Sequence, residues 1–198
     1  MKTALLLSGG MDSVSIAWWK RPDVAITVDY GQKPAEAEIV AAGQVARLLN
    51  IPHEVIRVDC SALGSGDMAG SAPSEVAPVS EWWPFRNQLL ITLAGMIAVK
   101  RSIKRLLLGA LATDGVHADG RADFVEHISK LLALQEGGIT VEAPAIELDA
   151  VELVRTSGID QATLAWAHSC HVGNYACGRC RGCVKHYNTW SALGWTPH

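Results

Sequence analysis

The chain has 198 residues, of which 49% are hydrophobic and 19% charged, and its formal net charge is −3 at pH 7. This length suits one domain, or one domain with a small appendage, and the hydrophobic share suits a compact soluble protein. The slight negative charge gives no general attraction to polyanions, so we expect small-molecule substrates and no nucleic acid partner.

The two longest apolar stretches are too short for a targeting or membrane-spanning segment. The first is cut off by Ser8-Gly9-Gly10 before it reaches the roughly 7 residues of a signal-peptide core. The second, residues 89–99, contains Thr92 and falls far below the roughly 18 residues of a membrane span. We therefore expect a cytoplasmic protein without membrane contact.

The predicted elements alternate between strands and helices. Five β-rich runs are interpreted as strands, at residues 3–7, 24–28, 54–58, 105–108 and 140–142. Five helices are predicted between and after them, at about residues 13–19, 39–49, 85–101, 121–136 and 149–157. The helix at 85–101 is apolar on nearly all sides, which indicates a buried helix.

This alternation predicts an α/β fold, in which right-handed βαβ units form a parallel sheet with helices on both faces. Ligands of such sheets bind beyond the carboxyl ends of the strands, where we expect residues 8–13, 29–32 and 111–121. Residues 61–82 are rich in Gly, Ser, Ala and Pro and show no clear periodicity. A loop of this length is either disordered or functional, and we interpret it as a lid over the ligand.

The turn after the first predicted strand is typical of an anion-binding loop. Ser8-Gly9-Gly10 leads into a helix that opens at Asp12-Ser13, so backbone N–H groups and the positive end of the helix dipole meet there. We expect positive φ at Gly9 and Gly10, which lets the backbone approach a phosphate. No lysine follows, which excludes the Gly-x-x-x-x-Gly-Lys-Ser/Thr loop and leaves an ordinary glycine turn as the alternative.

The same segment resembles the Ser-Gly-Gly-x-Asp-Ser loop of the ATP pyrophosphatase superfamily, which holds the pyrophosphate of ATP while a substrate oxygen attacks the α-phosphorus. The resemblance implies ATP binding and a fold like that of the adenine nucleotide alpha hydrolases. The residues implied to hold the nucleotide are Leu7, Ser8, Gly9, Gly10, Met11, Asp12, Ser13, Val14 and Ser15. Asp29, after the second strand, is placed to reach the ribose or a metal ion, unless it only forms a turn.

Four of the five cysteines form a cluster near the C-terminus with the spacing C-x6-C-x2-C-x2-C: Cys170, Cys177, Cys180 and Cys183. Four thiolates form a closed, tetrahedral site for structural zinc, and in a cytoplasmic protein this cysteine density argues against disulfides. An iron–sulfur cluster and a redox Cys-x-x-Cys pair are the alternatives. The histidines at 168, 171 and 186 are expected to surround the site rather than to replace a ligand.

The loop and the cysteine cluster occur in an order similar to that of the 7-cyano-7-deazaguanine synthase family of the queuosine pathway. The similarity extends from Ala4 to about Lys185. The intermediate motifs that match are Asp29-Tyr30-Gly31-Gln32, Pro84-x-Arg86-Asn87, Gly109 with Asp114, Asp119-x-Arg121-x-x-Phe124, and Ser169-Cys170. Members bind ATP, Mg²⁺ and structural zinc, and they convert 7-carboxy-7-deazaguanine and ammonia into the nitrile. The resemblance therefore implies an ATP-dependent carbon–nitrogen ligase.

The resemblance also implies roles for individual residues. Asp12, Ser13 and Arg86 are the expected catalytic residues, with Asp12 near Mg²⁺ and Arg86 paired with the substrate carboxylate or a phosphate. The expected substrate-binding residues are Tyr30, Gln32, Arg86, Asn87, Asp114, Asp119 and Arg121. Asp114 and Asp119 are candidates to bind the guanine-like edge, because a carboxylate accepts from N1–H and the 2-amino group together. Loop aspartates that cap turns and a solvated arginine are the alternatives.

Three departures from the family pattern affect presumed contacts with phosphate or substrate. Lys33-Pro34 replaces a basic residue and a histidine, and Phe85 replaces the glycine of Pro-Gly-Arg-Asn. Asp149-Ala150 replaces Thr-Lys, which removes a lysine that would contact phosphate. These changes leave open a related ligase that transfers the activated acid to a protein or another amine. A tRNA-thiolating enzyme with Cys180 and Cys183 as sulfur carriers and a non-catalytic zinc module are further alternatives.

We expect an ATP-binding α/β domain at residues 1–160 and a helical zinc-binding appendage at residues 161–198. Trp190 and Trp195 in the appendage are candidates to cover the contact surface of a homodimer.

Overall fold

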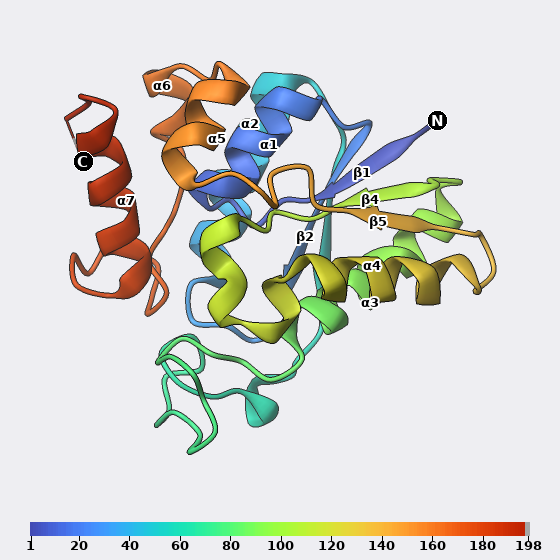
Figure 1. Cartoon of the computed structure of the whole chain (residues 1–198), viewed down its shortest axis with the longest axis horizontal. Coiled ribbons are helices and arrows are strands. Elements are labelled where there is room, and N and C mark those ends of the chain that lie inside the picture. Colours follow the sequence, from blue (N-terminus) through green and yellow to red (C-terminus); the bar gives the residue numbers. More distant parts are fainter. Residues whose placement is uncertain (197–198) are drawn as a thin grey trace.

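A single parallel sheet of five strands lies at the centre of the computed structural model, which describes residues 1–196 (Figure 1). The strands are β1 (Thr3–Leu6), β2 (Val24–Asp29), β3 (His53–Arg57), β4 (Arg105–Leu107) and β5 (Thr140–Glu142). Their order is β3-β2-β1-β4-β5, and each neighbouring pair is parallel. All five predicted strands are confirmed. The chain starts in the middle of the sheet and later changes direction beside β1, so the crevice between β1 and β4 is the expected ligand position.

The helices connect the strands and extend beyond them. They are α1 (Met11–Lys20), α2 (Ala35–Leu49), α3 (Arg86–Lys100), α4 (Ala122–Ala133), α5 (Ala150–Ser157), α6 (Gln161–Leu164) and α7 (Arg181–Ala192). Short 3₁₀ turns form η1 (Ser61–Leu63), η2 (Ala112–Val116) and η3 (Ala118–Gly120). The first five helices were predicted individually, whereas α6 and α7 lie in residues 161–198, which were expected to be helical without bounds for single helices.

Both faces of the sheet are buried, as the apolar composition of its strands requires. Along β1, Leu6 packs with α3 and α4 on one face, whereas Leu5 packs with α1, α2 and α5 on the other. Figure 1 shows α3 and α4 on one side of β4 and β5, with α1 and α5 on the opposite side. The predicted α/β class with helices on both faces is therefore confirmed.

Two predictions about burial were wrong. The α3 helix is buried only along the side that faces the sheet, and its Met96 and Val99 are 63% and 47% exposed. Nothing within residues 1–196 covers its outer side, so apolar composition alone misidentified a surface helix as a core helix. Trp190 is 1% exposed and packs in the same core as Leu5, so it cannot form the surface of a homodimer.

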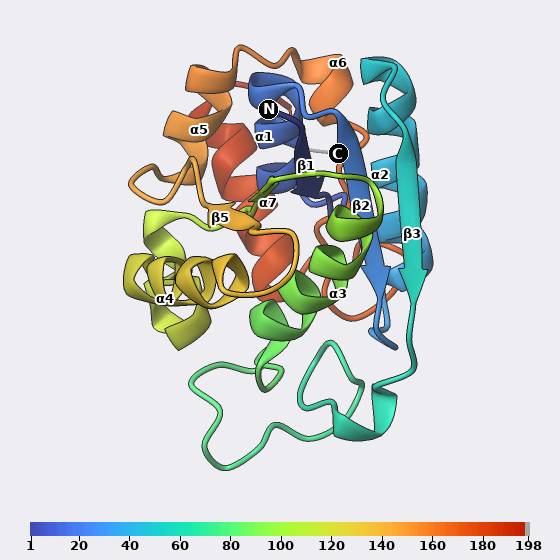
Figure 2. The same ribbon diagram turned by 90° about the vertical axis from the view of Figure 1, so that its right-hand side faces the viewer.

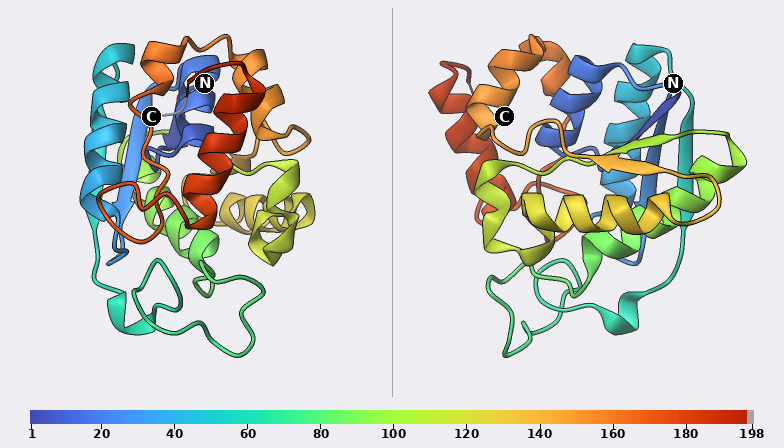
Figure 3. Two further views of the ribbon diagram at one scale, coloured as in Figure 1. Left: turned by 90° about the vertical axis from the view of Figure 1, so that its left-hand side faces the viewer. Right: turned by 45° about the vertical axis from the view of Figure 1, so that its right-hand side comes forward.

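Two segments determine the shape of the molecule around the strand ends. Residues 58–85 form a long connection with little regular structure, which lies below the sheet in Figure 2. The α7 helix lies across the front of the molecule when it is viewed from the carboxyl ends of the strands (Figure 3, left). No helix within residues 1–196 has the length and apolar character needed to cross a bilayer.

Candidate functional site

A cavity of about 760 Å³ opens at the carboxyl ends of β1, β2 and β4, between α1 and α7. Its lining includes residues at the strand ends, such as Leu7, Val28 and Leu108. The volume lies within the usual range for small-molecule sites, about 300–1,000 Å³. The position agrees with the rule that ligands of parallel sheets bind beyond the carboxyl strand ends.

The loop between β1 and α1 forms one wall of this cavity. Gly9 has φ +78°, and a Cβ atom there would lie 2.5 Å from the carbonyl oxygen of Glu38, so no other residue fits. Gly10 has φ −72°, which any residue can adopt, and the predicted need for a positive φ at this position was wrong. Gly10 is also the N-cap of α1 and gives its N–H groups no side-chain acceptor. The first turn of α1 is therefore suited to an anion.

Two hydroxyl groups lie beside these N–H groups. The Oγ atoms of Ser8 and Ser13 are 3.1 Å apart, and Ser13 Oγ donates to the Gly10 carbonyl at 2.9 Å. The Gly10 N–H in turn points to Ser8 Oγ at 3.4 Å. Both serines line the cavity, and their hydroxyl hydrogens are engaged with each other and with the Gly10 carbonyl, so an anion bound there would have to replace these hydrogen bonds.

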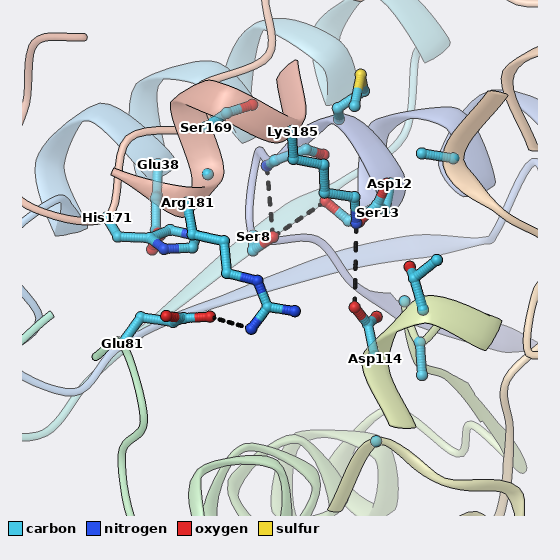
Figure 4. Close-up of a pocket in the computed structure, with 18 of the residues that line it drawn as sticks. Ser8, Asp12, Ser13, Glu38, Glu81, Asp114, Ser169, His171, Arg181 and Lys185 are labelled. Carbon is cyan, nitrogen blue, oxygen red and sulfur yellow. Dashed lines mark hydrogen bonds and ion pairs between the residues drawn. The ribbon is translucent and has the colours of Figure 1, made fainter. Parts of the chain in front are cut away.

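A lysine and two aspartates form a charged group next to the loop (Figure 4). Lys185 Nζ lies 2.7 Å from Asp12 Oδ2 and 4.0 Å from Asp114 Oδ1. Burial raises the pKa of Asp12, and the ion pair with Lys185 opposes that shift. Asp12 Oδ1 is buried and has no hydrogen-bond partner among residues 1–196. The group therefore keeps one free carboxylate oxygen at the cavity wall.

A second ion pair closes the cavity on the side of the long connection. Arg181 Nη1 donates to Glu81 Oε1 at 2.8 Å, and His117 Nε2 lies 3.8 Å from the same oxygen (Figure 4). Burial alone would raise the pKa of Glu81, but His117 and Arg181 bring it down to about 2. Glu81 is therefore ionised at neutral pH and fastens residues 58–85 to α7.

The end of the cavity near α3 is more apolar and contains one further cation. Arg86, Tyr30 and Met68 line it, and Arg86 Nη1 lies 3.2 Å from the sulfur of Met68. Glu38 also faces this end, where burial raises its pKa to about 7 although Gln32 donates a hydrogen bond to it at 2.8 Å. Met68 comes from the predicted lid, which thus contributes to the cavity wall.

The structure brings only some of the predicted site residues together. Those that line the cavity are Leu7, Ser8, Gly10, Met11, Asp12, Ser13, Tyr30, Arg86, Asn87 and Asp114. Those outside its lining are Gly9, Val14, Ser15, Asp29, Gln32, Asp119 and Arg121. Val14 and Ser15 lie on the buried side of α1, where Ser15 Oγ donates to the Met11 carbonyl at 2.9 Å. Neither side chain faces a ligand in the cavity.

The remaining residues outside the lining have structural partners. Asp119 Oδ2 accepts from the Asn87 N–H at 3.0 Å and so anchors the start of α3, while Arg121 Nε donates to the Gly115 carbonyl at 2.8 Å. Asp29 Oδ1 accepts from Gly31 N–H at 3.1 Å. Gln32 is 4% exposed and bonds to the backbone of β2 and its following turn. These contacts agree with the alternative interpretation of turn-forming residues.

The four clustered cysteines converge at the start of α7. Their Sγ atoms all lie within 4.8 Å of one another, and three of the four residues are buried. Cys180 is the N-cap of α7, since its sulfur accepts from the N–H of Cys183. A Cβ at Gly182 would lie 1.9 Å from the carbonyl oxygen of Ser169, so glycine is needed where the 169–171 segment crosses the helix. The cluster is a metal site, and it determines where α7 begins.

Sequence reasoning missed the cavity residues on α7. Arg181, Lys185 and Asn188 line the cavity, at spacings of four and three residues, which place them on one side of a helix. That periodicity was readable in the sequence once a helix had been predicted after Cys180. Glu81 and Glu38 carried no comparable signal, because their burial depends on distant segments.

Comparisons with known proteins agree with this geometry. A family model described as queuosine biosynthesis protein QueC matches residues 2–194. The 7-cyano-7-deazaguanine synthase of Methanosarcina barkeri is 30% identical, over 98% of this chain and 95% of that protein. The 7-cyano-7-deazaguanine synthase of Pseudomonas syringae pv. tomato is also 30% identical, over 98% of this chain and 94% of that protein.

A solved structure with a similar fold is the U34-tRNA thiolase NcsA from Methanococcus maripaludis with its 4Fe-4S cluster. The match has a TM-score of 0.51 and 15% sequence identity, and it covers 97% of this chain and 66% of that chain. At this identity the likeness establishes the fold alone. The family model, by contrast, spans nearly the whole chain, and the chain belongs to the queuosine biosynthesis protein QueC family.

Proposed function

We propose that this protein is a cytoplasmic, ATP-dependent ligase that converts 7-carboxy-7-deazaguanine and ammonia into 7-cyano-7-deazaguanine. The observation that carries the proposal is the family match over residues 2–194. That range includes the Ser8–Ser13 loop at the cavity and the four-cysteine cluster beside it.

The chemistry requires activation, because a carboxylate reacts with an amine only if oxide or hydroxide leaves. In the proposed reaction a carboxylate oxygen attacks the α-phosphorus of ATP and pyrophosphate leaves. Ammonia then displaces AMP and gives the amide. A second ATP activates the amide oxygen, and loss of AMP and the amide protons gives the nitrile. Both steps use the same ATP position, so no covalent nucleophile from the protein is needed.

The loop and α1 would hold the pyrophosphate part of ATP. The first-turn N–H groups of α1 are donors on one surface of the cavity, and the hydroxyls of Ser8 and Ser13, which bond to each other and to Gly10 in this structure, would turn to the phosphate when ATP binds. Preorganised donors of this kind stabilise the charge that develops as pyrophosphate leaves, and they align ATP with the attacking oxygen. Arg86, at the more apolar end, is our candidate for the substrate carboxylate, since a guanidinium binds it through two hydrogen bonds.

Mg²⁺ bound with ATP would neutralise charge on the phosphates. Asp12 fits this ion, because its Oδ1 is buried at the cavity wall and lacks a hydrogen-bond partner among the described residues. Asp114 forms an ion pair with the same lysine, Lys185, and lines the same cavity, so it could supply a second oxygen ligand.

Zinc is our assignment for the four-cysteine site. Thiolates around one zinc ion lie roughly 3.8 Å apart, given a Zn–S distance of about 2.3 Å and tetrahedral geometry. The distance between Cys177 Sγ and Cys183 Sγ is 4.0 Å, and no pair in the cluster exceeds 4.8 Å. A 4Fe–4S cluster binds each thiolate to a different iron atom, and a 2Fe–2S cluster divides the four thiolates between two iron atoms, so both need wider spacing between some pairs of thiolates. Cys180 and Cys183 are 7% and 3% exposed, which does not favour sulfur carriers.

The test is a reaction of the zinc-loaded protein with ATP, MgCl₂, 7-carboxy-7-deazaguanine and isotopically labelled ammonium, analysed by mass spectrometry. We expect labelled nitrile, with AMP and pyrophosphate formed in each activation step. Omission of ammonium should leave the acid or its adenylate.

A second candidate is a ligase that transfers the activated acid to another amine. The departures at Pro34, Phe85 and Ala150 favour it, because they alter positions that the family uses near phosphate or substrate. Adenylated acid without amide or nitrile under saturating ammonium would support this candidate and contradict nitrile synthesis.

A further inference from the structure

Three cations line the cavity within the described part of the chain: Arg86, Arg181 and Lys185. Arg181 is paired with Glu81, and Arg86 lies at the more apolar end. Lys185 alone contacts the anion-binding loop, through the 2.7 Å ion pair with Asp12. It is therefore the cation that the structure holds against the first turn of α1, whose N–H groups would hold pyrophosphate.

The position at which the family pattern places a lysine has no charge in this chain. Ala150, the first residue of α5, lines the same cavity as Lys185 and is 7% exposed. Asp149, just before it, is the N-cap of α5, and its Oδ1 accepts a hydrogen bond from the Glu152 N–H at 2.8 Å. No lysine other than Lys185 lines the cavity among residues 1–196. A triphosphate site that loses one cation needs another to offset the charge.

We infer that Lys185 replaces the lysine absent at position 150 and binds the pyrophosphate part of ATP. Without nucleotide, its ammonium group neutralises Asp12 and Asp114. Asp12 would hold Mg²⁺ when ATP is bound, and the ammonium group of Lys185, released from that carboxylate, would turn to the phosphate oxygens. A lysine suits this exchange, because its charge is compact and its four-carbon stem is flexible. The inference rests on ATP use in the proposed function and not on the identity of the product.

A structural role for Lys185 predicts a different outcome. If the lysine only neutralised Asp12, its removal would free the carboxylate for Mg²⁺ and leave pyrophosphate affinity unchanged or increased. If it binds pyrophosphate, its removal weakens pyrophosphate and ATP while AMP, which lacks the pyrophosphate group, changes little. Binding measurements therefore separate the two roles without reference to turnover.

The experiment is calorimetric titration of zinc-loaded Lys185→Met with Mg²⁺-pyrophosphate, α,β-methylene-ATP and AMP. We expect the first two dissociation constants to rise roughly tenfold to hundredfold, since a hydrogen bond to a charged group contributes about that factor. AMP affinity should change less than about threefold. Lys130→Met is the matched control, because Lys130 also pairs with a carboxylate, Glu126, on the exposed side of α4.

A rescue variant tests the replacement itself. Ala150→Lys in the Lys185→Met background should restore most of the lost pyrophosphate affinity, because it returns a cation to the same cavity. Should Lys185→Met lose stability, Lys185→Gln keeps a donor for Asp12 and should show the same loss of pyrophosphate binding. Unchanged pyrophosphate affinity in the folded variant would overturn the inference alone. Absence of binding to the wild-type protein would contradict both the inference and the proposed function.

Discussion

The two helices that face each other across the cavity, α1 and α7, contribute opposite properties to it. The α1 side supplies backbone N–H groups, hydroxyls and the carboxylate of Asp12, whereas α7 supplies the cations Arg181 and Lys185. The position of α1 follows from the central strand β1, but that of α7 follows from four cysteines that converge on its first turn. The comparison teaches that the metal site supports the proposed nucleotide site, because it positions the helix that carries two of the three lysine and arginine side chains lining the cavity within residues 1–196.

The largest effect is expected from removal of a metal ligand. Cys180→Ser should release zinc and lower the free energy of unfolding by about 4 kcal/mol or more, with Tm falling by roughly 10 °C. Activity should fall together with stability, because the first turn of α7 is no longer held in place by the metal site. Metal analysis and thermal melting measure this, with Cys60→Ser as the control because Cys60 lies outside the cluster. A stable, metal-retaining but inactive Cys180→Ser would instead support sulfur transfer.

On the α1 side, Asp12→Asn should lower kcat/KM roughly 100-fold or more while the fold and the zinc content stay unchanged. The carboxylate charge is lost, but the amide has the same shape and can still contact Lys185. Asp123→Asn, in the exposed first turn of α4, is the control for a charge change alone. Full turnover by a folded Asp12→Asn protein would contradict the assignment of this loop to the active site.

The ion pair between α7 and residues 58–85 should be visible as a pH dependence. The pKa of Glu81 is about 2 in the folded protein, against an ordinary value of 4.5. A lowered pKa stabilises the folded state above pH 4.5, and this contribution is lost as pH falls towards 2. Denaturant unfolding should therefore show Glu81→Gln less stable than wild type by up to about 3 kcal/mol at pH 6, with the difference shrinking below pH 4.5. A difference that does not change between pH 6 and pH 3 would mean that Glu81 acts through packing, and Glu126→Gln serves as the exposed control.

The smallest effect is expected for the cation that does not come from α7. Arg86→Lys should raise the KM for the deazaguanine acid roughly tenfold and leave the KM for ATP within about twofold, because a lysine cannot form the paired hydrogen bonds. Steady-state kinetics with each substrate varied in turn measure the two constants. A change confined to the KM for ATP would instead mean that Arg86 binds the phosphates. In that case α3 would contribute a cation to the phosphate site together with α7.

The fold and the α1 side of the site were predictable because local patterns carry them. Buried strands appear in the sequence as apolar runs, and the Ser8-Gly9-Gly10 turn directly precedes its helix, which begins at Met11. The side chains of Val14 and Ser15 lie outside the cavity lining, because the helical rotation of about 100° per residue turns them away from Ser13, so their predicted contact with nucleotide stays a prediction. The appendage was expected to be helical, but the start of α7 was not predicted, because a thiol caps it in place of Ser, Thr, Asp or Asn. Lys185 was missed because its partner is 173 positions away.

That separation has a consequence for biosynthesis. Asp12 leaves the ribosome well before the lysine that neutralises it, because 173 positions separate the two residues. A nascent protein that stops before the cysteine cluster contains the central strand, the anion loop and Arg86, yet it lacks α7 and the two cavity cations that α7 carries, Arg181 and Lys185. If ATP binds as proposed, high-affinity binding should therefore wait until α7 has been made and the four-cysteine cluster has taken up its metal ion.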